Sequence, residues 1–199
     1  TSNGTTFDET NNFRIEDKLY HGPDAATSGV IIFVAGNLYV STPGTGANDE
    51  SIQNGIDAAT AGNTVTVEGG SFTENVDVNK AITLAGLATI NGSLTVSASG
   101  ATIGPGFSPG VIASGNLSLG AGTTTAIELD GVGGPGVGHD QLDVTGTVTI
   151  NAAANLTLTL SFFPFPGTSF VIINNDAADA VTGEYNGLAD DSTFNLTDT

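Results

Sequence analysis

The chain is strongly acidic, because its 199 residues include 21 Asp and Glu but only three Lys and Arg, which gives a net charge of −18. Such a surface repels nucleic acids and anionic lipids, since both are bound mainly through Lys and Arg, and it disfavours acidic polysaccharides as substrates. The sequence contains no cysteine, which excludes disulfides and cysteine-type zinc sites, and it has no apolar run long enough for membrane insertion.

The first 47 residues are predicted to form a strand-rich arm that ends in a linker rich in Pro, Gly and Thr. Residues 13–15 and 19–20 are expected to be short extended pieces. The most hydrophobic run of the chain follows, and a strand at 38–40 comes after a Gly-Asn turn. Such a run needs burial on both faces, and at a sheet edge it attracts other chains. The run comprises Val30, Ile31, Ile32, Phe33 and Val34.

A single helix is predicted near residues 48–61. Asn48 or Asp49 can cap its first turn, where acidic side chains also suit the helix dipole, and Gly62 ends it. Its narrow apolar face consists of Ile52, Ile56 and Ala59. A short amphipathic helix of this kind is suited to covering the open end of a β-coil, where strand edges are otherwise exposed.

Short apolar segments follow the helix at close intervals. Each contains three or four residues that alternate between apolar and polar, which is the pattern of a strand with one buried face. The segments are too short and too close together for a β-sandwich, and no helix fits between them. The pattern therefore predicts a β-solenoid with coils of about 20 residues. The segments are 64–67, 76–78, 82–84, 88–90, 94–96 and 101–103.

The same pattern resumes after a Gly- and Pro-rich interruption. We expect three regions: an arm and linker (1–47), the helix with the first coils (48–110), and Gly-rich coils (111–199). Phe and Pro alternate at 162–166, and because Pro is a poor member of a strand ladder, this segment is predicted to be an edge, a loop or a docking patch. The later apolar segments are 111–112, 117–119, 126–129, 142–144, 148–150, 156–160 and 170–173.

Residues 51–86 resemble the opening of pectate-lyase-type right-handed parallel β-helices. In that family an amphipathic helix precedes GDTV-x-V, followed by G-x-Y-x-E-x-V-x-I-x-K-x-I-T-L-x-G. Here the two parts read GNTVTV and GSFTENVDVNKAITLAG, with Asn63 in place of the usual Asp and Phe72 in place of the usual Tyr. Lys80 matches a packing position of the motif. The resemblance implies an all-β fold, a right-handed parallel β-helix (β-solenoid) with one short capping α-helix.

A second resemblance covers much of the C-terminal half. Its segments are similar to the autotransporter-type β-strand repeats of bacterial exoproteins, although the GGDGND strand that usually ends such repeats is absent. We therefore expect the chain to be a piece of a longer surface protein. The resemblance implies a secreted or bacterial cell-surface location and a scaffold or adhesin role, with cell-surface glycans among the partners to consider. The segments are 115–122, 126–129, 139–148, 167–175 and 181–185.

The residues available limit the chemistry. A polysaccharide lyase of this fold needs a basic side chain at the reacting carbon and carboxylates for Ca²⁺, but no Lys or Arg follows Lys80. A hydrolase needs two carboxylates about 5–10 Å apart, whereas the neighbouring acids here suit helix caps and turns. We assign no catalytic residue and expect no cofactor unless Ca²⁺ binds. Residues 133–142 are similar to a Ca²⁺-binding nonapeptide, which makes Asp130, Asp140 and Asp143 the candidate ligands.

The ends of a β-solenoid carry unpaired strand edges, which are templates for another chain. We therefore expect a non-enzymatic extracellular structural protein, such as a surface-fibre, surface-layer or adhesin subunit, that forms homo-oligomers or homopolymers by stacking or strand donation. Run 30–34 and the side chains of Phe162, Phe163 and Phe165 are the predicted contacts, although burial within one monomer also explains them. The alternative is a glycan-binding or polysaccharide-cleaving β-helix protein.

Overall fold

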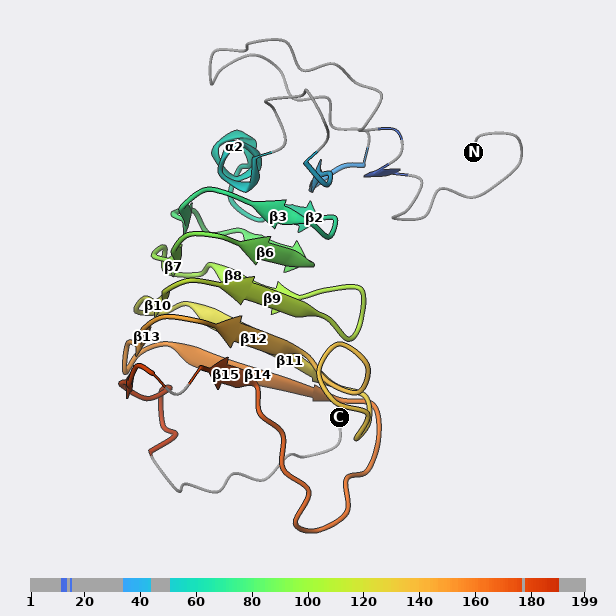
Figure 1. Ribbon diagram of the computed structural model, residues 1–199. Coiled ribbons are helices and arrows are strands. Elements are labelled where there is room, and N and C mark those ends of the chain that lie inside the picture. Colours follow the sequence, from blue (N-terminus) through green and yellow to red (C-terminus); the bar gives the residue numbers. More distant parts are fainter. Residues whose placement is uncertain (1–11, 14, 16–33, 44–50, 177, 190–199) are drawn as a thin grey trace, which may run out of the picture.

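The computed structural model describes residues 12–13, 15, 34–43, 51–176 and 178–189. Three all-parallel sheets run along the described chain, and successive strands pass from one sheet to the next (Figure 1). One passage around the three sheets is one coil, and the coils stack on one another. The fold is therefore a parallel β-helix, which confirms the prediction made from the spacing of the short apolar segments.

Each sheet takes one strand from every coil, and β1 adds a sixth strand to the first sheet. Sheet 1 contains β1 (Asn37–Val40), β2 (Thr64–Val67), β5 (Thr83–Gly86), β8 (Thr102–Pro105), β11 (Thr124–Leu129) and β14 (Asn155–Leu160). Sheet 2 contains β3 (Ser71–Phe72), β6 (Ala88–Ile90), β9 (Val111–Ser114), β12 (Gln141–Val144) and β15 (Ile173–Asn175). Sheet 3 contains β4 (Val76–Val78), β7 (Leu94–Val96), β10 (Leu117–Leu119), β13 (Val148–Ile150) and β16 (Val181–Thr182).

The strand register stacks equivalent side chains of successive coils in columns. Because alternate residues of a strand point to opposite faces, one column of each sheet lies inside the solenoid. Near the C-terminal end the inner column of sheet 1 passes to Thr125, whose hydroxyl accepts a hydrogen bond from the Tyr185 hydroxyl at 3.0 Å. The buried apolar part of this column comprises Leu38, Val65, Leu84 and Ile103.

The coils lengthen toward the C-terminal end. Val65 pairs with Leu84 and Leu84 with Ile103, so the first coils repeat after 19 residues. Ile103 then pairs with Thr125, 22 residues on, and Thr125 with Leu156, 31 residues on. The extra residues lie mainly at one corner, where the chain passes from sheet 1 to sheet 2. We call this surface the loop corner; it consists of residues 106–110, 130–140 and 161–172.

Helix α2 (Ile52–Ala58) covers the N-terminal end of the solenoid, next to β1, β2 and β4 (Figure 1). Its predicted apolar face is confirmed, because the Ile52 and Ile56 side chains are 0% exposed. The predicted bounds were wrong. Ser51 is the N-cap and its hydroxyl accepts a hydrogen bond from the backbone N–H of Asn54 at 3.2 Å. The predicted caps Asn48 and Asp49 lie outside the described residues.

The C-terminal end of α2 also comes earlier than predicted. Ala59 is already extended, with φ −69° and ψ 152°, so the helix stops at Ala58 and not at Gly62. The Ala59 side chain is nonetheless buried. Gly62 has a φ of +85° and forms part of the turn that leads into β2. Gly62 therefore does mark a turn, but the turn leads into β2 and does not end the helix.

Two side chains of the first coil bind the two ends of α2. The Glu74 carboxylate accepts hydrogen bonds from the Ile52 N–H at 2.7 Å and the Ser51 hydroxyl at 2.7 Å. The Lys80 ammonium donates to the carbonyls of Ile56 and Ala59 at 3.1 and 2.9 Å and to that of Asp57. An anion at the N-terminus and a cation at the C-terminus both interact favourably with the helix dipole. These contacts therefore hold the helix on the coil.

Two strand predictions were wrong. Residues 12, 13 and 15 are helical, not extended; the Phe13 ring is buried and meets the Tyr39 ring edge-on, with centroids 5.4 Å apart. The strand expected at 170–173 begins only at Ile173, which pairs with Leu142 on the inner column of sheet 2. The Phe170 ring is engaged in the loop corner instead. The extended pieces expected at 19–20 lie outside the described residues.

Candidate functional site

The loop corner stacks three insertions of increasing length along one edge of the solenoid. Residues 106–110 join β8 to β9, residues 130–140 join β11 to β12, and residues 161–172 join β14 to β15. The last two project well beyond the strands (Figure 1). Insertions into the repeats of a solenoid commonly gather on one face, and that face is often the binding face.

Asp140 ties the insertions together from inside. It is buried, and its two carboxylate oxygens accept hydrogen bonds from the backbone N–H groups of Gly110 at 2.7 Å and Glu128 at 2.8 Å. Burial raises the pKa of Asp140 above its usual value, and the two backbone hydrogen bonds oppose that shift in pKa. The Gln141 amide also donates to the Val171 carbonyl at 2.7 Å. Consecutive insertions are therefore fixed to one another by polar contacts.

Aromatic rings extend these links. The His139 and Phe170 ring centroids are 5.3 Å apart, and those of Phe162 and Phe170 are 6.0 Å apart, both in edge-on arrangements. His139 is only 6% exposed, and neither ring nitrogen has a hydrogen-bond partner. Its imidazole therefore serves as a packed ring between the second and third insertions.

The loop corner carries exposed apolar side chains on its outer surface. Among the described residues, seven large hydrophobic side chains are exposed, and all but Val181 lie in the three insertions. Phe163 and Phe165 are the most exposed, at 85% and 83%. Clustered exposed apolar side chains are typical of an interaction surface. The six in the loop corner are Phe107, Val132, Val137, Phe163, Phe165 and Val171.

The predicted self-assembly residues fall into two separate places. Phe163 and Phe165 lie on the loop corner with their side chains exposed, and Phe162 is half-buried beside Phe170. Val34 is half-buried and lies just before β1, at the N-terminal end of the solenoid. Val30, Ile31, Ile32 and Phe33 lie outside the described residues. The structure therefore does not bring the described members of the two groups together within one chain.

The C-terminal end of the described solenoid differs from the helix-covered end. The three sheets end there with β14, β15 and β16. In the part of the chain that is described, no further strand pairs with them. The inward-facing side chains of β14 are only half-buried, whereas those of earlier coils are fully buried. Tyr185 and Leu188 pack against the core at this end, and the Asn186 N–H donates to the Ala154 carbonyl at 2.7 Å. Among the described residues, the outer edges of β14, β15 and β16 carry no further strand, and an unpaired edge is the feature that accepts an added strand.

The three predicted calcium ligands do not form a cluster. Asp140 is buried with both oxygens bound to backbone N–H groups, and Asp130 is exposed. Asp143 points outward from β12 and accepts a hydrogen bond from the Asn174 amide at 2.7 Å. In the described ranges, no group of three or more His, Asp or Glu side chains is placed to hold a metal ion.

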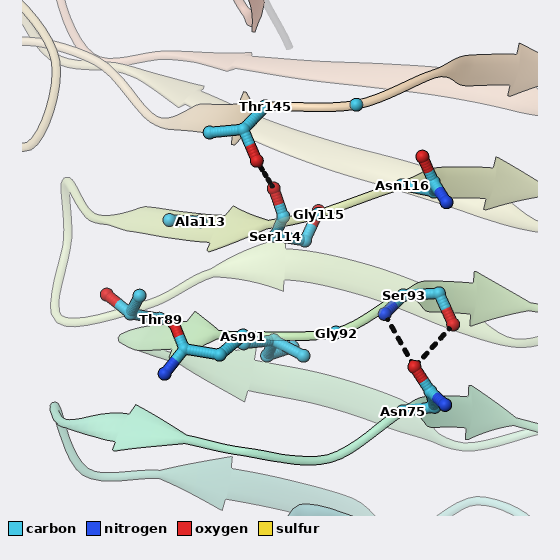
Figure 2. A pocket seen from close by; sticks show the side chains of 12 residues that line it. Asn75, Thr89, Asn91, Gly92, Ser93, Ala113, Ser114, Gly115, Asn116 and Thr145 are labelled. Atoms are coloured by element: carbon cyan, nitrogen blue, oxygen red, sulfur yellow. Dashed lines mark hydrogen bonds between the residues drawn. The ribbon is translucent and has the colours of Figure 1, made fainter.

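A shallow polar groove lies at a different corner, between sheets 2 and 3 (Figure 2). The Asn75 side chain accepts hydrogen bonds from the backbone N–H and hydroxyl of Ser93 on the next coil, at 2.9 and 3.1 Å. Asn116 binds Thr147 in the same way, at 2.9 and 3.2 Å. These amides therefore link successive coils, and their carbonyl oxygens are already used for that purpose.

Lys80 is the only Lys or Arg among the described residues, because Arg14 and Lys18 lie outside them. Its ammonium donates to three helix carbonyls. The prediction that this residue has a packing role, and not a catalytic one, fits that geometry.

Comparisons with protein-family models, with curated proteins and with solved structures found no match to the chain. None of the described helical residues belongs to a helix that is long and apolar enough to cross a membrane.

Several important side chains were not singled out from the sequence. Glu74, Asn75 and Asn116 lie in Gly-, Ser- and Asn-rich turns after strand ends. The residues that each of them binds are one coil away. Tyr185 fills the interior near the C-terminal end through its contact with Thr125. Once the coil length is known, searching one coil ahead of each turn Asn would have found the partners of Asn75 and Asn116, and searching one coil back would have found those of Glu74.

Proposed function

We propose that this chain is a non-enzymatic extracellular structural protein, a surface-fibre, surface-layer or adhesin subunit, that joins to other chains by accepting an added strand. The carrying observation is the asymmetry of the solenoid. Helix α2 covers one end through its buried isoleucines, while β14, β15 and β16 are the last described strands at the other end. One end covered by a helix, and one end at which no further described strand pairs, favour head-to-tail addition, which produces filaments when the contact does not close into a ring.

The backbone of β14 supports addition at the C-terminal end of the described solenoid. In a parallel ladder, alternate residues direct both N–H and C=O to the same neighbouring strand. The N–H groups of Asn155 and Ser161 donate to Thr123 and Leu129 of the preceding coil. The intervening even-numbered residues, Leu156 to Leu160, therefore direct theirs away from that coil. An added strand there gains hydrogen bonds and covers half-exposed leucines.

Sequence resemblance supports the location and the structural role. The likeness of residues 51–86 to pectate-lyase-type β-helices, and of the C-terminal half to autotransporter-type repeats, favours a secreted or cell-surface protein. A structural role also agrees with the use of the charged groups, since Glu74, Lys80 and Asp140 all bind backbone groups. Glycan binding or cleavage stays the alternative prediction.

The test is concentration-dependent assembly of the purified chain, followed by sedimentation velocity. Leu158→Asp places a charge on the half-buried inner face of β14, and Thr159→Asp places the same charge on its exposed outer face as a matched control. We expect the Thr159 variant to assemble like the wild type and the Leu158 variant to remain monomeric. Circular dichroism checks that both variants fold. Equal assembly by the two folded variants, or a wild type that is monomeric at all concentrations, overturns the proposal.

A further inference from the structure

The groove between sheets 2 and 3 is an uncharged site on a strongly acidic chain (Figure 2). Residues of successive coils line it, at 75, 89–93, 113–116 and 145–146, so it follows the axis of the solenoid. Its volume of about 590 Å³ lies in the range of small-molecule sites. None of its lining residues is Asp, Glu, Lys, Arg or His. Hydrogen bonds, and not ion pairs, must therefore select what binds there.

Glycines keep a strip of the groove free of side chains. The Gly115 N–H donates to the Gly92 carbonyl at 2.8 Å, and the Gly146 N–H donates to the Gly115 carbonyl at 2.9 Å. A Cβ added at Gly115 would lie 2.8 Å from the Gly92 carbonyl oxygen, and one at Gly146 would lie 2.2 Å from the Asn116 side-chain oxygen. The close stacking of coils therefore excludes larger residues and leaves room beside the polar side chains.

Two amides in the groove have hydrogen-bonding capacity to spare. The side-chain oxygens of Asn75 and Asn116 each accept a backbone N–H of the next coil, and a backbone N–H can only donate. The orientation of both amides is thereby fixed, and their NH₂ groups have no acceptor among the described residues. Asn75 and Asn116 lie two coils apart, which is about 10 Å. That distance is comparable with the length of one disaccharide in an extended glycan.

Ser114 supplies a hydroxyl at a more buried position. In the register of sheet 2 it lies between Ile90 and Val144, which are buried apolar side chains of the inner column. Ser114 is only 5% exposed but lines the groove, and its hydroxyl makes no hydrogen bond with the described residues. A buried hydroxyl without a hydrogen bond is unfavourable. A polar group of a ligand at this point would therefore stabilise it.

We propose that this groove binds a neutral oligosaccharide that lies along the axis of the solenoid. Sugar hydroxyls both donate and accept hydrogen bonds, so they suit the amide and hydroxyl groups of Asn75, Asn116 and Ser114. The net charge of −18 disfavours acidic sugars, and Asp143 is the neighbour of Ala113 in the register. The site is at a different corner from β14 and does not rest on strand addition, so either proposal can fail without the other.

Heteronuclear NMR of the full chain tests binding, in the Leu158→Asp background if the wild type assembles. The probes are cellohexaose and chitohexaose, with hexagalacturonate as the acidic comparison. We expect a neutral hexasaccharide at millimolar concentration to shift the side-chain amide signals of Asn75 and Asn116, and hexagalacturonate to leave them unchanged. If neither neutral probe shifts these signals, or if the acidic probe shifts them equally, the proposal is overturned.

Substitutions then locate the ligand. Asn116→Asp keeps the oxygen that accepts from Thr147 but removes the NH₂ donor, so the affinity should fall about tenfold. Asn151→Asp is the matched control, because the Asn151 side chain also accepts a backbone N–H, from Ala153 at 2.9 Å, but lies outside the groove. Ser114→Val gives this coil an apolar side chain like those of its neighbours and should weaken binding while the chain stays folded. Equal affinities of the two folded Asp variants contradict the assignment of the site.

Discussion

The charges at the two ends of α2 can be removed one at a time. Lys80→Met takes away the cation that binds three C-terminal carbonyls. A hydrogen bond to a charged group contributes about 1.5–3 kcal/mol, and partial access of water to this half-buried side chain replaces some of it, so we expect a loss of about 1–3 kcal/mol in the free energy of unfolding. Glu74→Gln keeps the shape but removes the anion, and we expect a loss of about 1–2 kcal/mol.

Burial of the helix sets a ceiling on these losses. Ile52 and Ile56 are completely buried, and each contributes about 1.5–3 kcal/mol, so docking of the helix is worth on the order of 3–6 kcal/mol from these two side chains. While the helix stays docked, the effects of the two substitutions should add. If the double variant releases the helix, its loss should fall short of the sum.

Urea unfolding of the single and double variants measures these free energies. Hydrogen exchange at the Ile52 and Gln53 amides, which donate to Glu74, shows whether the helix end opens. Asp130→Asn removes a charge from an exposed carboxylate and should change stability by less than about 0.5 kcal/mol. Unchanged stability and unchanged exchange in both Glu74→Gln and Lys80→Met would refute the reasoning.

Three further predictions concern buried groups. Burial raises the pKa of Asp140, so its contribution to stability is greatest below the usual carboxyl pKa and declines as the pH rises through the raised value. The stability advantage of the wild type over Asp140→Asn should therefore shrink from acid to neutral pH. A constant difference between the two in unfolding titrations contradicts this. Burial raises the pKa of Tyr185 to about 12, so the stability of the wild type should fall between about pH 10 and 12, and that of Tyr185→Phe should fall less. Below that range the variant should be less stable by about 1 kcal/mol, because it lacks the hydroxyl. Melting temperatures of wild type and variant that change in parallel across this pH range count against the prediction. Gly86 has a φ of +110°, and a Cβ added there would lie 2.1 Å from the Val67 carbonyl oxygen. Gly86→Ala should therefore lower the free energy of unfolding by about 2 kcal/mol or more, whereas Gly131→Ala, with open space around the added Cβ, should leave it unchanged. Equal melting temperatures of the two variants disprove the steric argument.

Much of the fold could be predicted because most strands carry their own signal. The alternation in segments such as 76–78 and 94–96 matches β4 and β7 to the residue, since a strand with one buried face needs that pattern. β3 was missed because two residues are too short to show alternation. The run at 170–173 misled for the opposite reason. Phe170 packs against His139 in the loop corner, and only Ile173 of this run belongs to a strand.

The candidate site was predictable only in part. The Phe and Pro alternation at 162–166 pointed to a loop or docking patch, and Phe163 and Phe165 are exposed in a loop. The role of Asp140 in linking backbone groups could not be predicted from the sequence, because the stacking of coils alone brings the N–H groups of Gly110 and Glu128 to it. An acidic residue near glycines suggests a cation site locally, whereas burial against two backbone N–H groups decides its role.

Negative-stain electron microscopy of the purified chain, with and without millimolar Ca²⁺, tests the central claim most directly. Head-to-tail joining through the last described coil predicts unbranched filaments that lengthen with protein concentration. In Leu158→Asp, whose inner face of β14 is charged, the filaments should be absent, and in Thr159→Asp they should persist. Isolated particles of single-chain size at every concentration, in both the presence and the absence of Ca²⁺, would contradict the account.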